Sequence, residues 1–231
     1  MPVVSEPPVV LVHGWGGSYA RTWQQPGWQA LLEDAGRTVV GVDLLGHGQA
    51  PKPHDPEAYA DLTERIVDAV GDGTFDAVGF SLGAITLLEL ATRHPERFGR
   101  LAVMGVGRNL FERDDERTKR IIAAVEGEAS DDVTAQLFAQ YSRQPGNDPV
   151  ALAAIMRRRG ARALGAEELG RITCPVLVVM GDKDYAGPAD PLVAVLPDAR
   201  AVTIRNCDHF ATTEAFGAID AVLEFLEAVP G

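Results

Sequence analysis

Cysteine, basic leader residues and long apolar runs are scarce in this chain of 231 residues, and each scarcity excludes a class of protein. The only two cysteines, Cys174 and Cys207, form neither a zinc-ligand spacing nor a disulfide framework, which favours reduced thiols and a cytoplasmic location. No apolar run approaches the roughly 20 residues that span a bilayer. The opening stretch, MPVVSEPPVVLV, has no basic region before its apolar residues and is unlike a signal peptide. We therefore expect no association with membranes.

Positive charge is scarce as well. Lysine and arginine together number 21 against 33 acidic residues, so the formal net charge is −12 and the pI is about 4.8. Such a balance repels nucleic-acid backbones, so nucleic acid is not an expected partner. What the chain does contain is 46% hydrophobic and 23% charged residues, which is typical of a globular protein with one large core.

Short β-branched runs alternate with helical patterns over most of the chain. Each run is apolar on both faces, which is typical of a parallel strand covered by helices. The runs cover residues 9–12, 38–42, 75–80, 101–106, 175–180 and 200–205. The helical patterns between and after them include residues 56–70, 81–93 and 214–227. This alternation predicts an α/β protein with an open, doubly wound parallel sheet of six strands.

The alternation stops between residues 109 and 163, where the sequence is charged and helical. Short helices are expected around residues 121–125, 133–141 and 149–156. An insert between two parallel strands lies at the edge of the sheet, over the carboxyl ends of the strands, where ligands bind. The predicted organisation is a core domain of residues 1–108 and 164–231, with a helical cap of residues 109–163 that selects the substrate.

The segment Gly79-Phe80-Ser81-Leu82-Gly83 fits the motif G-x-S-x-G between a predicted strand and a predicted helix. Glycines permit the sharp turn that would hold the serine oxygen above the sheet. The helix that follows aims its free N–H groups at the same point, so the Leu82 N–H is a candidate oxyanion donor. A serine with a purely structural role is the alternative for a lone pentapeptide.

Other strand ends supply the partners that a serine nucleophile needs. The first predicted strand ends in HGWGG (13–17), where the Trp15 N–H would be a second oxyanion donor. A serine hydroxyl also needs an oriented base. Later strand ends carry Asp182 and Asp184, and then His209, in the chain order that accompanies this motif. The residues alone leave both aspartates open as the acid.

These motifs resemble the α/β-hydrolase superfamily along almost the whole chain, and its esterase, lactonase and carbon–carbon hydrolase branch in particular. GVDLLGHGQA (41–50) is similar to the D-x-x-G-H-G-x-S loop of that branch, with Ala50 in place of serine. TRHPERF (92–98) resembles the stretch after the nucleophile helix. CPVLVVMGDKD (174–184) resembles the strand that bears the acid, and the G-x-x-D pattern of the family selects Asp184.

One departure from the family concerns the start of the chain. Members usually open with an antiparallel hairpin, whereas only twelve residues precede His13. The resemblance therefore implies an α/β-hydrolase fold that lacks this hairpin, in a monomer or homodimer.

Together the residues and the resemblance predict a serine hydrolase that uses Ser81, Asp184 and His209 and needs no metal or organic cofactor. The expected substrate is a small molecule with an acyl group, namely a carboxylic ester, thioester or lactone, that forms an acyl-enzyme on Ser81. The candidate pocket residues are Trp15, Phe80, Phe138, Tyr141, Ile155 and Met156.

Three interpretations stay open. A carbon–carbon bond hydrolase or lyase would use the same triad, and a non-catalytic ligand receptor would keep the fold and the pocket only. The run of arginines at 157–159 is interpreted as a solvated helix face, and contact with a substrate carboxylate is the alternative.

Overall fold

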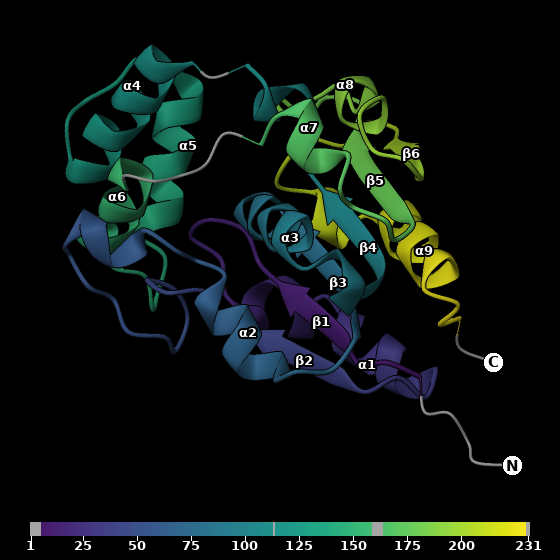
Figure 1. Ribbon diagram of the computed structural model, residues 1–231. Helices are drawn as coiled ribbons and strands as arrows, with labels where there is room; N and C mark the ends of the chain where they lie inside the picture. Colours follow the sequence, from purple (N-terminus) through teal and green to yellow (C-terminus); the bar gives the residue numbers. More distant parts are fainter. Residues whose placement is uncertain (1–5, 113, 159–163, 230–231) are drawn as a thin grey trace, which may run out of the picture.

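The computed structural model describes residues 6–112, 114–158 and 164–229. Arg159, the last residue of the predicted arginine run, lies outside these described residues. Six strands form one sheet in the order β2-β1-β3-β4-β5-β6 (Figure 1). The strands are β1 (Val9–Val12), β2 (Val39–Val42), β3 (Phe75–Phe80), β4 (Phe98–Met104), β5 (Val176–Gly181) and β6 (Ala199–Ile204).

Every neighbouring pair of strands in this sheet is parallel. No antiparallel pair occurs among the residues that the structure describes. The predicted six-stranded parallel sheet is therefore confirmed. Only β4 differs clearly from its predicted bounds, because it begins at Phe98 and not at residue 101.

Helices cover both faces of the sheet and make two hydrophobic layers. Val9 and Leu11 pack into the layer with α1 (Trp28–Asp34) and α9 (Phe216–Phe225). Val10 and Val12 pack into the opposite layer, and all four valine and leucine side chains are fully buried. That opposite layer contains α2 (Glu64–Val70), α3 (Leu82–Arg93), α7 (Ala166–Leu169) and α8 (Asp190–Val193). Burial on both faces explains why the strands are continuous apolar runs.

One predicted helix is wrong. Residues 56–70 were expected to form one helix, but they form a 3₁₀ helix at Pro56–Tyr59 and, after a turn, the separate helix α2. Between them the Asp61 carboxylate accepts hydrogen bonds from the backbone N–H and the hydroxyl of Thr63. An aspartate that bonds to the chain two residues later favours a turn over a continuous helix.

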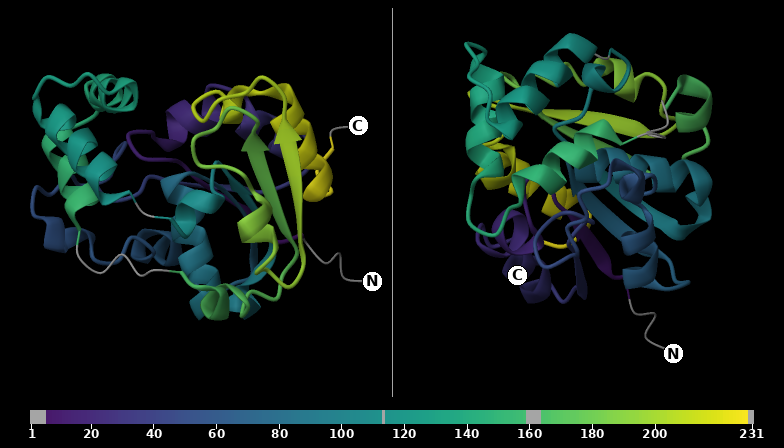
Figure 2. Two further views of the ribbon diagram at one scale, coloured as in Figure 1. Left: turned by 90° about the horizontal axis from the view of Figure 1, so that it is seen from above. Right: turned by 90° about the vertical axis from the view of Figure 1, so that its left-hand side faces the viewer.

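Three helices form the middle of the predicted cap. They are α4 (Asp115–Glu126), α5 (Val133–Ser142) and α6 (Pro149–Arg157). Each begins after an aspartate whose side chain accepts from a backbone N–H of the first turn, namely Asp114, Asp132 and Asp148. Figures 1 and 2 show these helices gathered on one side of the molecule, beyond the sheet. The domain boundaries at 109 and 163 stay a prediction.

Within the described part of the chain, no helix is long and apolar enough to cross a membrane.

Candidate active site

Ser81 lies in the turn between β3 and α3 with a backbone φ of 51°, a left-handed value that is uncommon outside glycine. Two close approaches explain the glycines around it. A Cβ on Gly83 would lie 2.3 Å from the Val12 carbonyl oxygen, and one on Gly79 would lie 2.7 Å from the Leu87 side chain. The Ser81 N–H donates to the Met104 carbonyl at 2.8 Å, which ties the turn to β4. The sheet therefore holds the serine in a strained turn.

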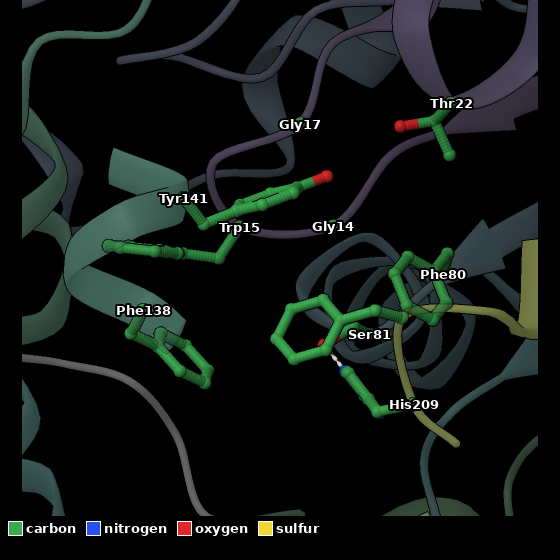
Figure 3. A pocket seen from close by; sticks show the side chains of 10 residues that line it. Gly14, Trp15, Gly17, Thr22, Phe80, Ser81, Phe138, Tyr141 and His209 are labelled. Atoms are coloured by element: carbon green, nitrogen blue, oxygen red, sulfur yellow. Dashed lines mark hydrogen bonds between the residues drawn. The ribbon is translucent and has the colours of Figure 1, made fainter. Parts of the chain in front are cut away.

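His209 and Asp184 complete a chain of hydrogen bonds that begins at Ser81. His209 Nε2 lies 3.0 Å from Ser81 Oγ (Figure 3), and His209 Nδ1 lies 2.9 Å from both carboxylate oxygens of Asp184. Both His209 and Asp184 are buried. Ala186 N–H also donates to Asp184 Oδ1 at 2.8 Å, which orients the carboxylate. The structure thus brings together Ser81, His209 and Asp184, the aspartate that the family resemblance selected.

Asp182 serves a different contact. Its carboxylate accepts from the Cys207 N–H at 3.2 Å, and backbone hydrogen bonds, the one from Asn206 foremost, lower the pKa of this carboxyl. The side chain therefore supports the loop between β6 and His209. Of the two aspartates, only Asp184 is placed against the imidazole.

Aromatic rings surround the imidazole of His209. Ring centroids lie 4.5 Å away for Tyr185, 4.9 Å for Phe80 and 5.5 Å for Phe210. Burial raises the pKa of Tyr185, which keeps its phenol neutral. The Arg117 guanidinium of α4 lies 5.0 Å from the centre of the Tyr185 ring, so a cation of the cap contacts a ring that itself contacts His209.

The loop after β1 passes directly over the serine. A Cβ on Gly14 would lie 2.8 Å from the Phe80 ring and 3.2 Å from the Ser81 Cβ, so a side chain at this position would crowd the turn that holds the serine. His13 orients the loop: its Nδ1–H donates to the Gly14 carbonyl at 2.8 Å, and its Nε2 accepts from the Leu44 N–H at 3.2 Å. We assign this tautomer from the two partners. Burial lowers the pKa of His13 and favours this neutral form.

Two backbone N–H groups remain available beside Ser81. Among the described residues, the amides of Trp15 and Leu82 donate to no protein acceptor. Trp15 belongs to the loop that touches Ser81, and Leu82 opens the helix α3, whose first N–H groups have no partner within the helix. The geometry therefore leaves two donors free for a ligand oxygen.

A small cavity of about 20 Å³ opens at Ser81, which is room for about one water molecule. Figure 3 shows aromatic side chains of the cap facing the serine and His209 across it. Four predicted pocket residues line it, namely Trp15, Phe80, Phe138 and Tyr141. Gly17 of the HGWGG segment also lines the cavity, as do Thr22 and Phe210, which no motif in the sequence marks.

Two other predicted pocket residues lie elsewhere. Ile155 is fully buried in the core, and its side chain packs where Gly46 has no Cβ. Met156 lines a different chamber of about 690 Å³ between the cap and the core, together with charged side chains such as Arg117 and Asp115. Helix α6 therefore turns Ile155 to the core and Met156 to this chamber, and neither side chain lines the cavity at Ser81.

A larger groove of about 420 Å³ continues from the cavity toward solvent. It shares four wall residues with the cavity, and its outer wall is polar. The shared residues are Thr22, Phe80, Tyr141 and Phe210, and the outer ones include Arg21, Gln144, Asp208 and Glu214. The groove and the cavity therefore adjoin at these four side chains.

The other groups considered for chemistry are metal ligands, the two cysteine thiols and the arginine run of the cap. No group of three or more histidine, cysteine or acidic residues could hold a metal ion within the described ranges. Burial raises the pKa of the Cys207 thiol, and it raises that of Cys174 to about 11, so neither thiol is activated. Arg157 forms an ion pair with Glu126 on the surface of the cap, which agrees with a solvated face for this part of the arginine run.

Comparisons with known proteins agree with this fold. A family model described as "alpha/beta hydrolase fold" matches residues 7–118. The chain is 28% identical to a pimeloyl-[acyl-carrier protein] methyl ester esterase of Neisseria meningitidis, over 96% of this chain and 94% of that one. It is 26% identical to a 2-hydroxymuconate semialdehyde hydrolase of Pseudomonas putida, over 90% and 82% of the two chains.

Among solved structures, the chain superposes on an enol-lactonase from Burkholderia xenovorans LB400 with a TM-score of 0.77. That likeness, at 22% identity, covers 98% of this chain and 94% of the other. The sheet order, the turn at Ser81 and these likenesses lead to one conclusion: the chain has the α/β-hydrolase fold.

Proposed function

We propose that the protein is a serine hydrolase that cleaves small carboxylic esters through an acyl-enzyme on Ser81. The observation that carries this proposal is the hydrogen-bond chain from Ser81 Oγ through His209 to Asp184, with distances of 3.0 and 2.9 Å. The geometry fits the role of a base that is itself held by a carboxylate.

In the first half of the reaction, His209 Nε2 takes the hydroxyl proton as Ser81 Oγ bonds to the acyl carbon. The imidazolium that forms is stabilised by the buried carboxylate of Asp184. The bond to the alcohol oxygen then breaks, and that oxygen leaves with the proton from His209. In the second half, His209 takes a proton from water, the hydroxide attacks the acyl carbon, and Ser81 leaves with the proton.

The free amides of Trp15 and Leu82 fit the role of oxyanion donors. They belong to two elements that adjoin Ser81, the loop after β1 and the first turn of α3, and we assign them as the two donors to the carbonyl oxygen of a bound ester. Preorganised N–H groups of this kind contribute about 10²–10³ in rate each. No step of this reaction needs a metal or an organic cofactor.

The aromatic cavity favours a small group at the serine. Its volume of about 20 Å³ accepts a methyl or similarly short substituent, while the adjoining groove of about 420 Å³ accepts the longer part of the substrate. The N. meningitidis relative is named for a methyl ester, whose alcohol part is a single methyl group. A short-alcohol ester with an extended acyl chain is the substrate class we propose.

The test is Ser81→Ala in turnover of p-nitrophenyl acyl esters and in labelling by a fluorophosphonate. Both should disappear, while the melting temperature stays nearly unchanged because an alanine fills the same turn. Near wild-type ester hydrolysis by Ser81→Ala would refute the nucleophile. Wild-type protein that neither labels nor hydrolyses esters, yet binds them, would favour the receptor alternative.

The second candidate is a carbon–carbon bond hydrolase, because the P. putida relative is named as a semialdehyde hydrolase. It would use the same three residues, so Ser81→Ala alone does not separate the two reactions. Parallel assays of methyl esters and of vinylogous diketones with the wild-type protein do separate them, and turnover of the diketone alone would favour the second candidate.

A further inference from the structure

Two hydrogen bonds join the cap to the loop that carries the Trp15 amide. Asn147, in the loop between α5 and α6, donates from Nδ2 to the Gly16 carbonyl at 2.7 Å. The Trp15 indole N–H donates to the Leu152 carbonyl of α6 at 3.1 Å. These contacts join residues more than 130 positions apart, and both end on the segment Gly14–Gly17, which we call the oxyanion loop.

The hydrogen bond from Asn147 continues through the oxyanion loop as a chain of peptide groups. Asn147 donates to the carbonyl of the Gly16–Gly17 peptide, and the N–H of that same peptide donates to the Gly14 carbonyl at 3.0 Å. The Gly14 carbonyl belongs to the Gly14–Trp15 peptide, whose N–H is the proposed oxyanion donor. Hydrogen bonds in such a chain polarise one another, so the first donor both orients the last N–H and strengthens it.

The surroundings of Asn147 keep its amide in one orientation. Nδ2 also donates to the Tyr141 carbonyl at 3.0 Å, so both of its hydrogens are used. A Cβ on Gly16 would lie 2.7 Å from the Tyr141 ring, and φ of this glycine is +71°, so the turn of the oxyanion loop is fitted closely to the end of α5. Arg21 supports the same carbonyl from the core, with Nη1 3.4 Å from the Gly16 oxygen.

We propose that Asn147 is a positioning residue for the oxyanion hole, so that the cap takes part in the chemical step as well as in the choice of substrate. This inference rests on the proposed serine-hydrolase function. It assigns to Asn147 an effect on kcat, whereas a residue that only holds the cap in place would affect substrate binding and stability.

A second contact between cap and core, made by the neighbouring residue Asp148, offers a matched control. Asp148 makes its own contact between cap and core, where His54 Nε2 lies 2.8 Å from Asp148 Oδ2. This pair is exposed and does not touch the oxyanion loop. Asn147→Ala and His54→Ala therefore each remove a contact between cap and core, and only the first one cuts the chain that ends at Trp15.

The experiment measures kcat, KM and the rate of fluorophosphonate labelling with a short p-nitrophenyl ester. For Asn147→Ala we expect kcat and the labelling rate to fall by about 10²-fold, the loss typical of a misplaced reacting group, while KM changes by less than about threefold. Labelling should fall in parallel, because the phosphonyl oxygen accepts from the same N–H groups. His54→Ala should leave both rates within about twofold. Asn147→Asp, which keeps the shape but loses both N–H donors, should behave as Asn147→Ala.

Two outcomes would overturn the inference: equal effects of Asn147→Ala and His54→Ala, or a change in KM with kcat intact. If Asn147→Ala does not fold, Asn147→Asp takes its place, because it keeps the shape of the side chain and loses both donors, and unchanged kcat in that variant would overturn the inference too. A failure of the proposed function looks different, since Ser81→Ala would then retain activity. Loss with Ser81→Ala and normal kcat with Asn147→Ala would overturn the positioning role alone.

Discussion

Replacing Asp184 by asparagine exchanges one carboxylate oxygen for an NH₂ group and should remove most of the activity. The carboxylate accepts the Nδ1–H of His209 with both oxygens at 2.9 Å, which leaves Nε2 unprotonated and able to take the Ser81 proton. In Asp184→Asn the amide oxygen would be held by the same Ala186 N–H. The NH₂ group would then face Nδ1 and favour the opposite tautomer, in which Nε2 already carries a hydrogen. We expect kcat to fall by about 10⁴-fold, or about 5 kcal/mol of transition-state stabilisation.

Asp182→Asn is the control, because it makes the same chemical change two residues earlier. The Asp182 carboxylate accepts from the Cys207 N–H, and an asparagine oxygen can accept in the same way. Its kcat should stay within about threefold of wild type, with a modest loss of melting temperature. The assay is initial-rate hydrolysis of a p-nitrophenyl ester by both variants, with circular dichroism to check the fold. A larger loss in Asp182→Asn than in Asp184→Asn would refute the assignment of the acid.

Two further predictions concern stability and substrate choice. Burial lowers the pKa of His47 well below its ordinary value of 6.5, so below about pH 6.5 the unfolded chain binds a proton that the folded chain does not. The free energy of unfolding should therefore fall as the pH falls, by up to about 1.4 kcal/mol per pH unit for this residue, and thermal melts at successive pH values would measure that slope. Phe138→Ala should enlarge the aromatic cavity and shift the preference toward bulkier alcohol groups by about tenfold or more, whereas Ile155→Ala should cost about 2–5 kcal/mol of stability without that shift. Kinetics with methyl and butyl esters would contradict the cavity argument if both variants changed preference alike.

The core of the fold could be predicted because its signals are local. Each strand is a short run that must be apolar on both faces, so the six runs are visible without knowing their partners. The ends of helices are harder to predict where a side chain competes with the helix for backbone hydrogen bonds. The Asp61 hydrogen bonds to Thr63 divide the predicted helix over 56–70, and nothing in the apolar spacing marks that turn.

The pocket residues could be predicted only in part from the sequence. Phe138 lines the cavity while Ile155 lies in the core, although both are apolar residues at helical spacing in the cap. Which face of a helix meets the site depends on how the helix packs, and α6 packs against the 3₁₀ helix at Pro56–Tyr59. Phe210 lies in a turn and Thr22 in a helix of only five residues, Ala20–Gln24, so neither belongs to a periodic pattern that marks it in the sequence.

By itself the sequence determined the parallel sheet, the turn at Ser81 and the chain order of serine, acid and histidine, since these depend on backbone conformation and on residues at strand ends. A family resemblance selected Asp184 over Asp182, but only the tertiary structure placed its carboxylate against His209 and brought Asn147 to the Gly16 carbonyl 131 positions away. The physical reason is that such contacts form between segments that are distant in the chain and meet only when their elements pack. Their geometry follows from the orientation of whole elements, and a local pattern of residues does not encode it.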